Sequence, residues 1–330
     1  MNVDISAFGM LPDGQIVQVV TLRATGTCAR VLTLGAALQD FRLPGVPHSL
    51  TLGSNDVAAY LGPMRYAGAI VGPVANRIGG ARVTINCKPY ALQANDGENT
   101  LHGGDTGTHA AIWQIAEAAA DFVVLYCDLP SSFDGLPGNR RIMARYELAP
   151  MALSLTISAE SDAATLMNPA PHPYWNLDGS LDIAGHHLRV DAETYLPTDA
   201  ACLPTGAQTP VQGTRFELRA GHVLTREGFD HNFCLSDAPT PQRPVAWLTG
   251  RSGLRMTLET SAPGLQVYDG SGITSGGFNG HNGAPYHNFA GIALEPQFWP
   301  DAPNHTNFPS ILLPPSTEFR QKTRFSFARR

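Results

Sequence analysis

The sequence predicts an all-β protein in which large antiparallel sheets pack face to face, and three observations support this. Short segments with alternating apolar and polar residues recur along the chain. Glycine and proline, at 33 and 26 residues, are plentiful, and no long amphipathic pattern of helical period stands out. A period of two over four to eight residues indicates half-buried strands, and segments rich in glycine and proline form the tight turns between them.

Six segments carry the alternating pattern most clearly and are predicted to be strands. They span residues 82–86, 141–148, 153–158, 187–190, 255–260 and 265–270. Residues 110–121 (AAIWQIAEAAAD) are the best helix candidate, but their apolar positions follow the helical period poorly. We therefore predict mostly β structure throughout the chain.

All 330 residues are predicted to form a single domain. No charge run, low-complexity tract or fixed-period repeat marks a boundary, and β-sandwiches often reach about 250 residues undivided. Two sheets packed face to face would leave a concave outer face free for a ligand. We expect the functional site on that face.

Composition excludes several classes of function. A formal charge of −6 and a pI near 6.0 provide no basic stripe for nucleic acid. The N-terminal segment lacks a secretory leader, and no apolar stretch approaches the roughly 20 residues of a membrane helix, so we expect a cytoplasmic protein that binds no membrane. The five cysteines are scattered, which argues against a disulfide framework and a zinc site.

Asn76, Arg77 and His102 form the first candidate cluster, in the segments ANRI and LHGG. Arginine offers a rigid fork of donors for adjacent sugar hydroxyls, and an imidazole can donate to a ring oxygen. Gly103 and Gly104 would let a ligand approach the backbone closely. A surface arginine and a turn histidine are the alternative reading.

His172 is the centre of the second cluster. Pro171 and Pro173 bracket it and restrict the backbone, and Tyr174 and Trp175 follow. An aromatic pair beside a rigidly held histidine can form a platform for a sugar next to a proton donor. A histidine that is only structural is the alternative.

Three further polar residues complete the candidate site. Asp230 precedes an apolar run and Gln266 lies within an expected strand, and these two side chains can grip a diol because both accept hydrogen bonds. Asp230 as a turn cap and Gln266 as a solvent-facing residue are the alternatives. Glu295 follows residues 292–294, so we expect it at the end of a buried strand, where an unpaired carboxylate is costly.

Together these groups suit the exchange of sugar anomers. Opening the ring requires one group that protonates the ring oxygen and another that removes the proton of the anomeric hydroxyl. A histidine can supply the first proton and a glutamate held ionised can accept the second. This chemistry requires no metal, nucleotide or electron carrier, so we expect no cofactor and a small neutral monosaccharide as the partner.

The chain resembles the aldose 1-epimerases, or galactose mutarotases, a family of the β-supersandwich fold class. The resemblance runs in the family's order along nearly the whole chain, through LGAALQDFRLPG, VGPVANRIGGARV, LHGG, PYWNLDG, FDHNF, LQVY and ALEPQFWPDAPNHTNFPSILLPP.

The resemblance implies a role for each candidate residue. It implies that His172 is the general acid and Glu295 the general base. It also implies that five residues bind and orient the sugar, with Asn76 the weaker member: Asn76, Arg77, His102, Asp230 and Gln266.

Three departures from the family pattern bear on the sugar that is preferred. Pro73 stands where the family often has arginine, and residues 171–176 read PHPYWN in place of a run such as NHSYFN. Trp175 is accordingly predicted to contact the substrate by reshaping the floor of the pocket. The glycine-rich segment 275–289 is the third departure, since it differs from what the family has before the Glu295 strand, and it is predicted to be a mobile rim.

Other readings stay open on the sequence alone. A hexose-6-phosphate 1-epimerase of the same fold would need more cationic groups, and a non-catalytic sugar-binding or sensing protein would not need an acid and base pair. A glycoside hydrolase normally uses two carboxylates. Galactose, glucose, xylose and arabinose are all candidate substrates, and the protein is expected to be a monomer or a homodimer.

Overall fold

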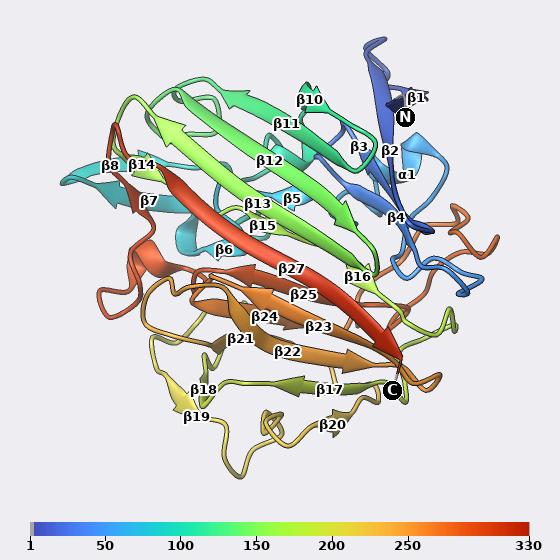
Figure 1. Cartoon of the computed structure of the whole chain (residues 1–330). Coiled ribbons are helices and arrows are strands. Elements are labelled where there is room, and N and C mark those ends of the chain that lie inside the picture. The colour runs from blue at the N-terminus through green and yellow to red at the C-terminus, as the bar shows by residue number, and fades with distance from the viewer. Residues whose placement is uncertain (1–2, 330) are drawn as a thin grey trace.

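The computed structural model describes residues 3–329, and it consists almost entirely of strands, turns and loops (Figure 1). Within these residues, helical structure is limited to four short elements: α1 (Val57–Tyr60) and the 3₁₀ turns η1 (Gly79–Ala81), η2 (Thr108–Ala110) and η3 (Ala302–Asn304). None of the helices in this range is long and apolar enough to cross a membrane. The predicted all-β class is confirmed.

The largest sheet has nine strands, and its long central strands β12, β13 and β27 run diagonally across Figure 1. Its strands in spatial order are β10 (Gln114–Ala118), β11 (Phe122–Leu129), β12 (Arg140–Ala149), β13 (Ala152–Ser161), β27 (Phe319–Arg329), β23 (Leu254–Thr260), β22 (Arg243–Thr249), β17 (His187–Val190) and β20 (His222–Val223).

A second sheet of six strands carries the candidate chemistry. Its strands in spatial order are β16 (Tyr174–Trp175), β25 (Ile292–Gln297), β24 (Gly264–Tyr268), β21 (Asp230–Cys234), β18 (Thr194–Tyr195) and β19 (Thr209–Pro210).

The N-terminal part of the chain forms a four-stranded sheet in sequence order: β1 (Asp4–Met10), β2 (Ile16–Ala24), β3 (Thr27–Leu32) and β4 (Leu38–Arg42). Four two-stranded ladders complete the fold: β14 (Thr165–Leu166) with β26 (Leu312–Leu313), β15 (Ala170–Pro171) with β5 (Ile70–Val71), β6 (Arg77–Ile78) with β9 (Thr100–Leu101), and β7 (Arg82–Ile85) with β8 (Lys88–Ala91).

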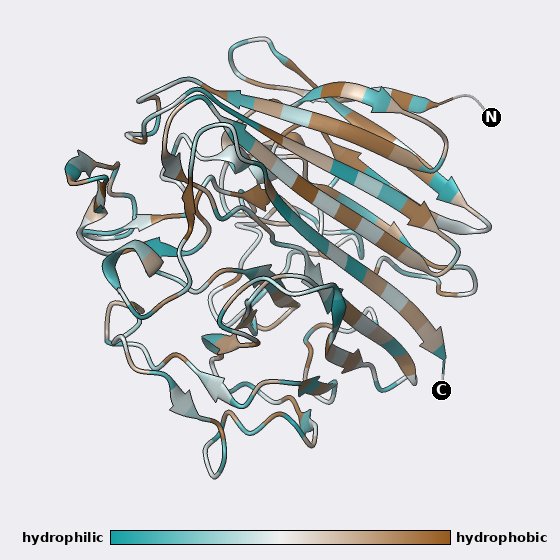
Figure 2. Ribbon diagram, turned by 60° about the vertical axis from the view of Figure 1, so that its left-hand side comes forward, coloured by the Kyte–Doolittle hydropathy of each residue, from teal (hydrophilic) through white to brown (hydrophobic). Residues whose placement is uncertain are grey.

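All six predicted strands are present, as β7, β12, β13, β17, β23 and β24. Brown and teal alternate along the long strands of the large sheet in Figure 2, which is the period of two read from the sequence. The helix candidate at 110–121 is wrong: residues 114–118 form β10, which pairs with β11, and Trp113 is buried. Strand pairing with β11 overrides the weak helical preference of the alanines there.

One continuous apolar cluster lies between the sheets. It takes Leu153 and Phe325 from the nine-stranded sheet, Val267 and Leu294 from the six-stranded sheet and Val31 from the four-stranded sheet. Because neighbouring residues of a strand point to opposite faces, the other face of the six-stranded sheet is free for a site. The predicted packing of large sheets around a shared core is confirmed.

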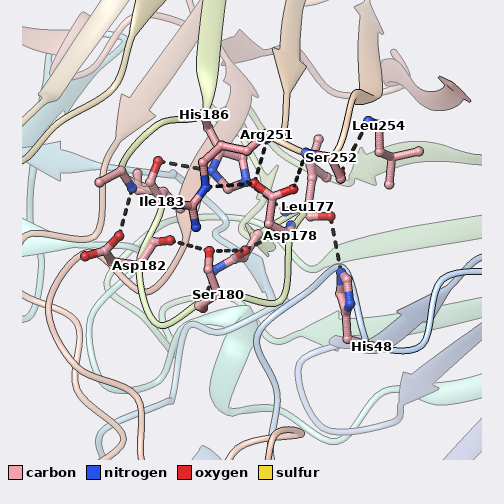
Figure 3. Close-up of polar contacts among 12 residues, drawn as sticks. His48, Leu177, Asp178, Ser180, Asp182, Ile183, His186, Arg251, Ser252 and Leu254 are labelled. Carbon is pink, nitrogen blue, oxygen red and sulfur yellow. Dashed lines mark hydrogen bonds and ion pairs between the residues drawn. The ribbon is translucent and has the colours of Figure 1, made fainter. Parts of the chain in front are cut away.

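The segment that follows β16 is tied down by a buried polar cluster (Figure 3). His186 is fully buried, and its Nε2 accepts a hydrogen bond from the Leu177 backbone N–H at 3.0 Å. The Asp178 carboxylate accepts from the backbone N–H groups of Arg251 and Ser252 at 2.7 and 3.0 Å. These contacts fasten the turn after β16 to the hairpin between β22 and β23.

Candidate active site

Six of the predicted site residues converge on one cavity of about 250 Å³. They are Asn76, Arg77, His102, His172, Asp230 and Glu295. They come from segments as far apart in the sequence as β6 and β25, so the tertiary structure assembles the site. A cleft of this kind with a few convergent polar groups is the usual form of a small-molecule site.

The register of the six-stranded sheet explains why three of the polar side chains share a face. Glu295 on β25 lies opposite Gln266 on β24, and Gln266 lies opposite Asn232 on β21. Tyr268 and Asp230, each two residues away on the same strands, form the next pair. Directly opposed residues in an antiparallel pair point to the same side, so this row of polar side chains faces the cavity region. Glu295 lies within β25, whereas the sequence placed it at a strand end.

His172 and Glu295 form the centre of the site. The His172 Nε2 atom lies 3.4 Å from the Glu295 Oε1 atom, and both side chains are almost fully buried. The backbone of His172 is held on both sides, since its N–H donates to the Ala69 carbonyl and its carbonyl accepts from the Gly68 N–H, both at 2.9 Å. The imidazole is therefore anchored by its main chain next to the carboxylate.

Burial favours the neutral form of both side chains. It lowers the pKa of His172 to about 4. Burial, reinforced by the charge of Asp230, raises the pKa of Glu295 well above its ordinary value of 4.5, against an opposing effect of Arg77. Burial thus favours an uncharged pair with one proton on Glu295, whereas the sequence analysis expected an ionised glutamate. Removal of the carboxylate from water is the physical reason for the difference.

His102 is fixed as a hydrogen-bond donor toward the cavity. The Asn76 backbone N–H donates to His102 Nδ1 at 3.0 Å, and the His102 backbone N–H donates to the Asn76 carbonyl at 3.0 Å. Because Nδ1 accepts, the proton of the neutral ring lies on Nε2. Burial, together with the neighbouring His172, lowers the pKa of His102 well below 6.5 and keeps the ring neutral. Both residues adopt left-handed backbone conformations, φ 62° and 54°, which the reciprocal hydrogen bonds hold in place.

The glycines beside His102 do not serve the purpose expected from the sequence. A Cβ on Gly103 would lie 2.2 Å from the Gly72 carbonyl oxygen, and one on Gly104 would lie 3.0 Å from the Gln93 side chain. The space that a Cβ atom would need at these glycines is occupied by neighbouring protein atoms, not left open for a ligand.

Arg77 lies between two carboxylates. Its Nε atom donates to Asp96 Oδ2 at 2.7 Å, and its NH1 group lies 3.7 Å from Asp230 Oδ2. Asp230 also accepts from Gln266 Nε2 at 2.6 Å. Burial raises the pKa of Asp230, while Arg77 and Gln266 oppose that shift. Gln266 is 3% exposed and is not among the residues that line the cavity, although its Nε2 donates to Asp230; its contact with the sugar stays a prediction.

Trp175 does not line the cavity, and the prediction that it shapes the pocket floor is wrong. The side chain is fully buried in the core between the sheets, with ring centroids 4.9 Å from Phe325 and 6.0 Å from Phe41. Its neighbour Tyr174 lines the cavity in its place. Adjacent strand residues face opposite sides, so only one member of this aromatic pair can reach the site.

Several lining residues were not predicted from the sequence: Pro63, Tyr66, Leu101, Tyr268, Gly272 and Ile273. Tyr268 could have been found, because it stands two residues after Gln266 in an expected strand and so shares its face. Tyr66 lies in a run of turns, where no periodic signal exists, and its ring packs 4.8 Å from His102 and 4.7 Å from His109.

The segment 275–289 does not form the predicted rim. The lining residues nearest to it in sequence are Gly272 and Ile273, just before it. Within the segment, Tyr286 is buried and its hydroxyl donates to the Gly53 carbonyl at 3.2 Å. The segment therefore packs against the protein rather than bordering the cavity.

His102, His172 and Glu295 also bring potential metal-ligand atoms within 4.8 Å of one another. A metal ligand must offer a lone pair, but His102 uses its Nδ1 lone pair for Asn76 and carries a proton on Nε2. One imidazole and one carboxylate then remain free. The donor set suits hydrogen bonding to hydroxyl groups better than coordination of a metal ion.

Comparison with known proteins decides the family. The family model described as aldose 1-epimerase matches residues 18–326. The chain belongs to the aldose 1-epimerase family. A galactose mutarotase of Mus musculus is 34% identical over 341 residues, which cover 99% of each chain. An aldose 1-epimerase of Escherichia coli strain K12 is 31% identical over 338 residues, covering 96% of this chain and 97% of that protein.

Solved structures of aldose 1-epimerase relatives share the whole fold. An aldose epimerase homologue from C. elegans superposes with a TM-score of 0.88 at 28% identity, covering 94% of this chain and 98% of that one. A galactose 1-epimerase from Lactobacillus acidophilus NCFM gives a TM-score of 0.85 at 26% identity and covers 99% of both chains. The β-supersandwich assignment made from the sequence is confirmed.

Proposed function

We propose that the protein interconverts the α and β anomers of a free aldose by opening and reclosing the sugar ring. The observation that carries this proposal is the buried His172–Glu295 pair, 3.4 Å apart, at the wall of a cavity that also holds the donors His102 and Arg77. Membership of the aldose 1-epimerase family supports it. Galactose is the first sugar to test, because mammalian relatives are named galactose mutarotases.

The electrostatics of the pair fit the ring-opening step. When the sugar binds, its hydroxyl groups can hydrogen-bond to the Glu295 carboxylate, and the proton of the pair passes to His172. His172 then protonates the ring oxygen while Glu295 accepts the proton of the anomeric hydroxyl. The products are the open-chain aldehyde, neutral His172 and protonated Glu295, which is the protonation state that burial favours.

Reclosure uses the same two groups in reverse. After rotation about the bond between the first and second carbons, the hydroxyl that carried the ring oxygen attacks the other face of the aldehyde. His172 takes the proton of that hydroxyl and Glu295 returns a proton to the carbonyl oxygen, so protons balance over the cycle. His102, Asn76, Arg77 and Asp230 hold the sugar, and Gln266 acts through Asp230.

A hexose-6-phosphate epimerase is less well supported. Arg77 is the only cationic side chain lining the cavity among the described residues, and Asp96 and Asp230 already neutralise it. A phosphate group needs an unengaged arginine or a cluster of cations.

Polarimetry tests the proposed function. Freshly dissolved α-anomers of galactose, glucose, xylose and arabinose are followed with chelator-treated protein, with the double variant His172→Asn/Glu295→Gln, and without protein. We expect the wild type to accelerate at least one sugar and the double variant to match the uncatalysed rate. No acceleration of any sugar, with sugar binding detected by calorimetry, would instead favour the non-catalytic sugar-binding protein.

We further propose that the whole chain works as one domain, because a single apolar cluster extends from Val20 to Phe327. A monomeric or homodimeric state and a cytoplasmic location stay predictions. Size-exclusion chromatography with light scattering measures the first of these directly.

A further inference from the structure

A buried carboxylate outside the cavity joins two of the segments that line it. Asp269 follows β24 directly and is 1% exposed. It does not line the cavity, because its neighbour Tyr268 faces that side. A buried carboxylate without a charged partner is costly unless hydrogen bonds satisfy it.

The Asp269 carboxylate is satisfied by three backbone N–H groups. Its Oδ2 atom accepts from Gly228 at 2.8 Å and from Phe229 at 3.0 Å, and its Oδ1 atom accepts from Ser271 at 3.2 Å. The Asp269 backbone N–H in turn donates to the Phe229 carbonyl at 3.0 Å. One side chain thus clamps two turns that are about 40 residues apart in sequence.

Both clamped turns lead directly into the cavity. Gly228 and Phe229 immediately precede Asp230, and Ser271 immediately precedes Gly272 and Ile273. The Gly272 N–H also donates to the Tyr268 hydroxyl at 2.8 Å, which ties the second turn to another lining residue.

We infer that Asp269 is a positioning residue for the sugar-binding side of the site, where it fixes Asp230 and the Gly272–Ile273 edge. The inference rests on the proposed function. His172 and Glu295 are held by other elements, namely the Ala69 and Gly68 backbone and strand β25. Loss of Asp269 should therefore weaken the binding of the sugar and spare the proton-transfer step.

Asp178 provides a matched control. Its carboxylate also accepts two backbone N–H bonds, from Arg251 and Ser252, and its side chain is 8% exposed (Figure 3). It clamps a hairpin turn and does not line the cavity. Replacement of either aspartate removes acceptors for backbone N–H groups, but the groups that Asp269 holds immediately precede lining residues, whereas Arg251 and Ser252 are remote in sequence from every lining residue.

The experiment compares steady-state mutarotation by wild type, Asp269→Leu, Asp269→Asn, Asp178→Leu and Asp178→Asn, with melting temperatures for all five. We expect Asp269→Leu to raise KM roughly tenfold with little change in kcat, the loss expected for one charge-assisted hydrogen bond to the sugar. Asp269→Asn keeps one carbonyl oxygen and should give a smaller rise. The Asp178 variants should keep the wild-type KM.

The split between KM and kcat separates positioning from simple destabilisation. A variant that is partly unfolded has less active protein, which lowers the apparent kcat and leaves KM unchanged. A wild-type KM in Asp269→Asn, with only the melting temperature or the apparent kcat reduced, would overturn the inference. The KM of Asp269→Asn also tests the inference if Asp269→Leu does not fold. Failure of the proposed function would look different, because the wild type itself would then accelerate no sugar.

Discussion

Replacement of Glu295 by glutamine should abolish most of the activity and at the same time change how the stability depends on pH. The substitution keeps the size of the side chain and removes its ability to accept the anomeric proton. A positioned general base contributes about 100- to 10,000-fold, so kcat should fall by that factor. Polarimetry with the best sugar measures this loss.

The stability effect follows from the raised pKa of Glu295. Burial raises this pKa in the folded protein well above the value of 4.5, so the folded protein keeps a proton that the unfolded chain has released. Wild-type stability from this group is complete below the unfolded pKa and is lost as the pH rises through the folded pKa. The loss amounts to at most ~1.4 kcal/mol per pH unit in that window. Glu295→Gln has no such group.

Urea unfolding of the wild type and Glu295→Gln between pH 5 and 8 measures the difference. The other titrating groups are present in both proteins, so the difference in unfolding free energy reports Glu295. We expect the variant to become progressively more stable than the wild type as the pH rises. Parallel stability curves would show that the pKa of Glu295 is not raised, and a wild-type rate would remove it from the catalytic pair.

Three further predictions concern binding, packing and acid. Arg77→Ala should chiefly raise KM, and an unchanged KM and rate would exclude Arg77 from the sugar contacts. Trp175→Ala should lower the unfolding free energy by about 3–5 kcal/mol, because it removes a fully buried aromatic, while KM stays at the wild-type value; a large KM change with normal stability would restore the pocket-floor role. The activity should fall as the pH drops to about 4, because His172 is then protonated while Glu295 also keeps its proton and neither can act as a base. A fall in activity already near pH 6.5 would contradict the effect of burial on the pKa of His172.

The sequence by itself determined the fold class and most of the site. A strict period of two fixes which residues of a strand share a face, so segments such as 153–158 and 265–270 were identifiable as strands without their partners. The motifs around His172 and Glu295 predicted an acid–base pair, because few side chains can exchange protons near neutral pH.

The tertiary structure decided which face of each strand meets the cavity. Alternation shows that Tyr174 and Trp175 oppose each other, but not which of them enters the core, and the packing on Phe41 and Phe325 settles that question for Trp175. Gln266 carries the right chemistry for a sugar contact, but the sequence did not show that the register of β24 places it opposite Asn232 and Glu295 or that its amide donates to Asp230.

The protonation states of the site and the residues that hold it in place could likewise not be predicted from the sequence. A pKa depends on burial and on charges brought close by folding, so the low pKa of His172 and the high pKa of Glu295 exist only in the assembled cavity. Asp269 reads as an ordinary turn aspartate in the sequence. Its connection to Gly228 and Phe229 arises because β21 and β24 are neighbours in the sheet, and local residue patterns do not encode such long-range strand pairing.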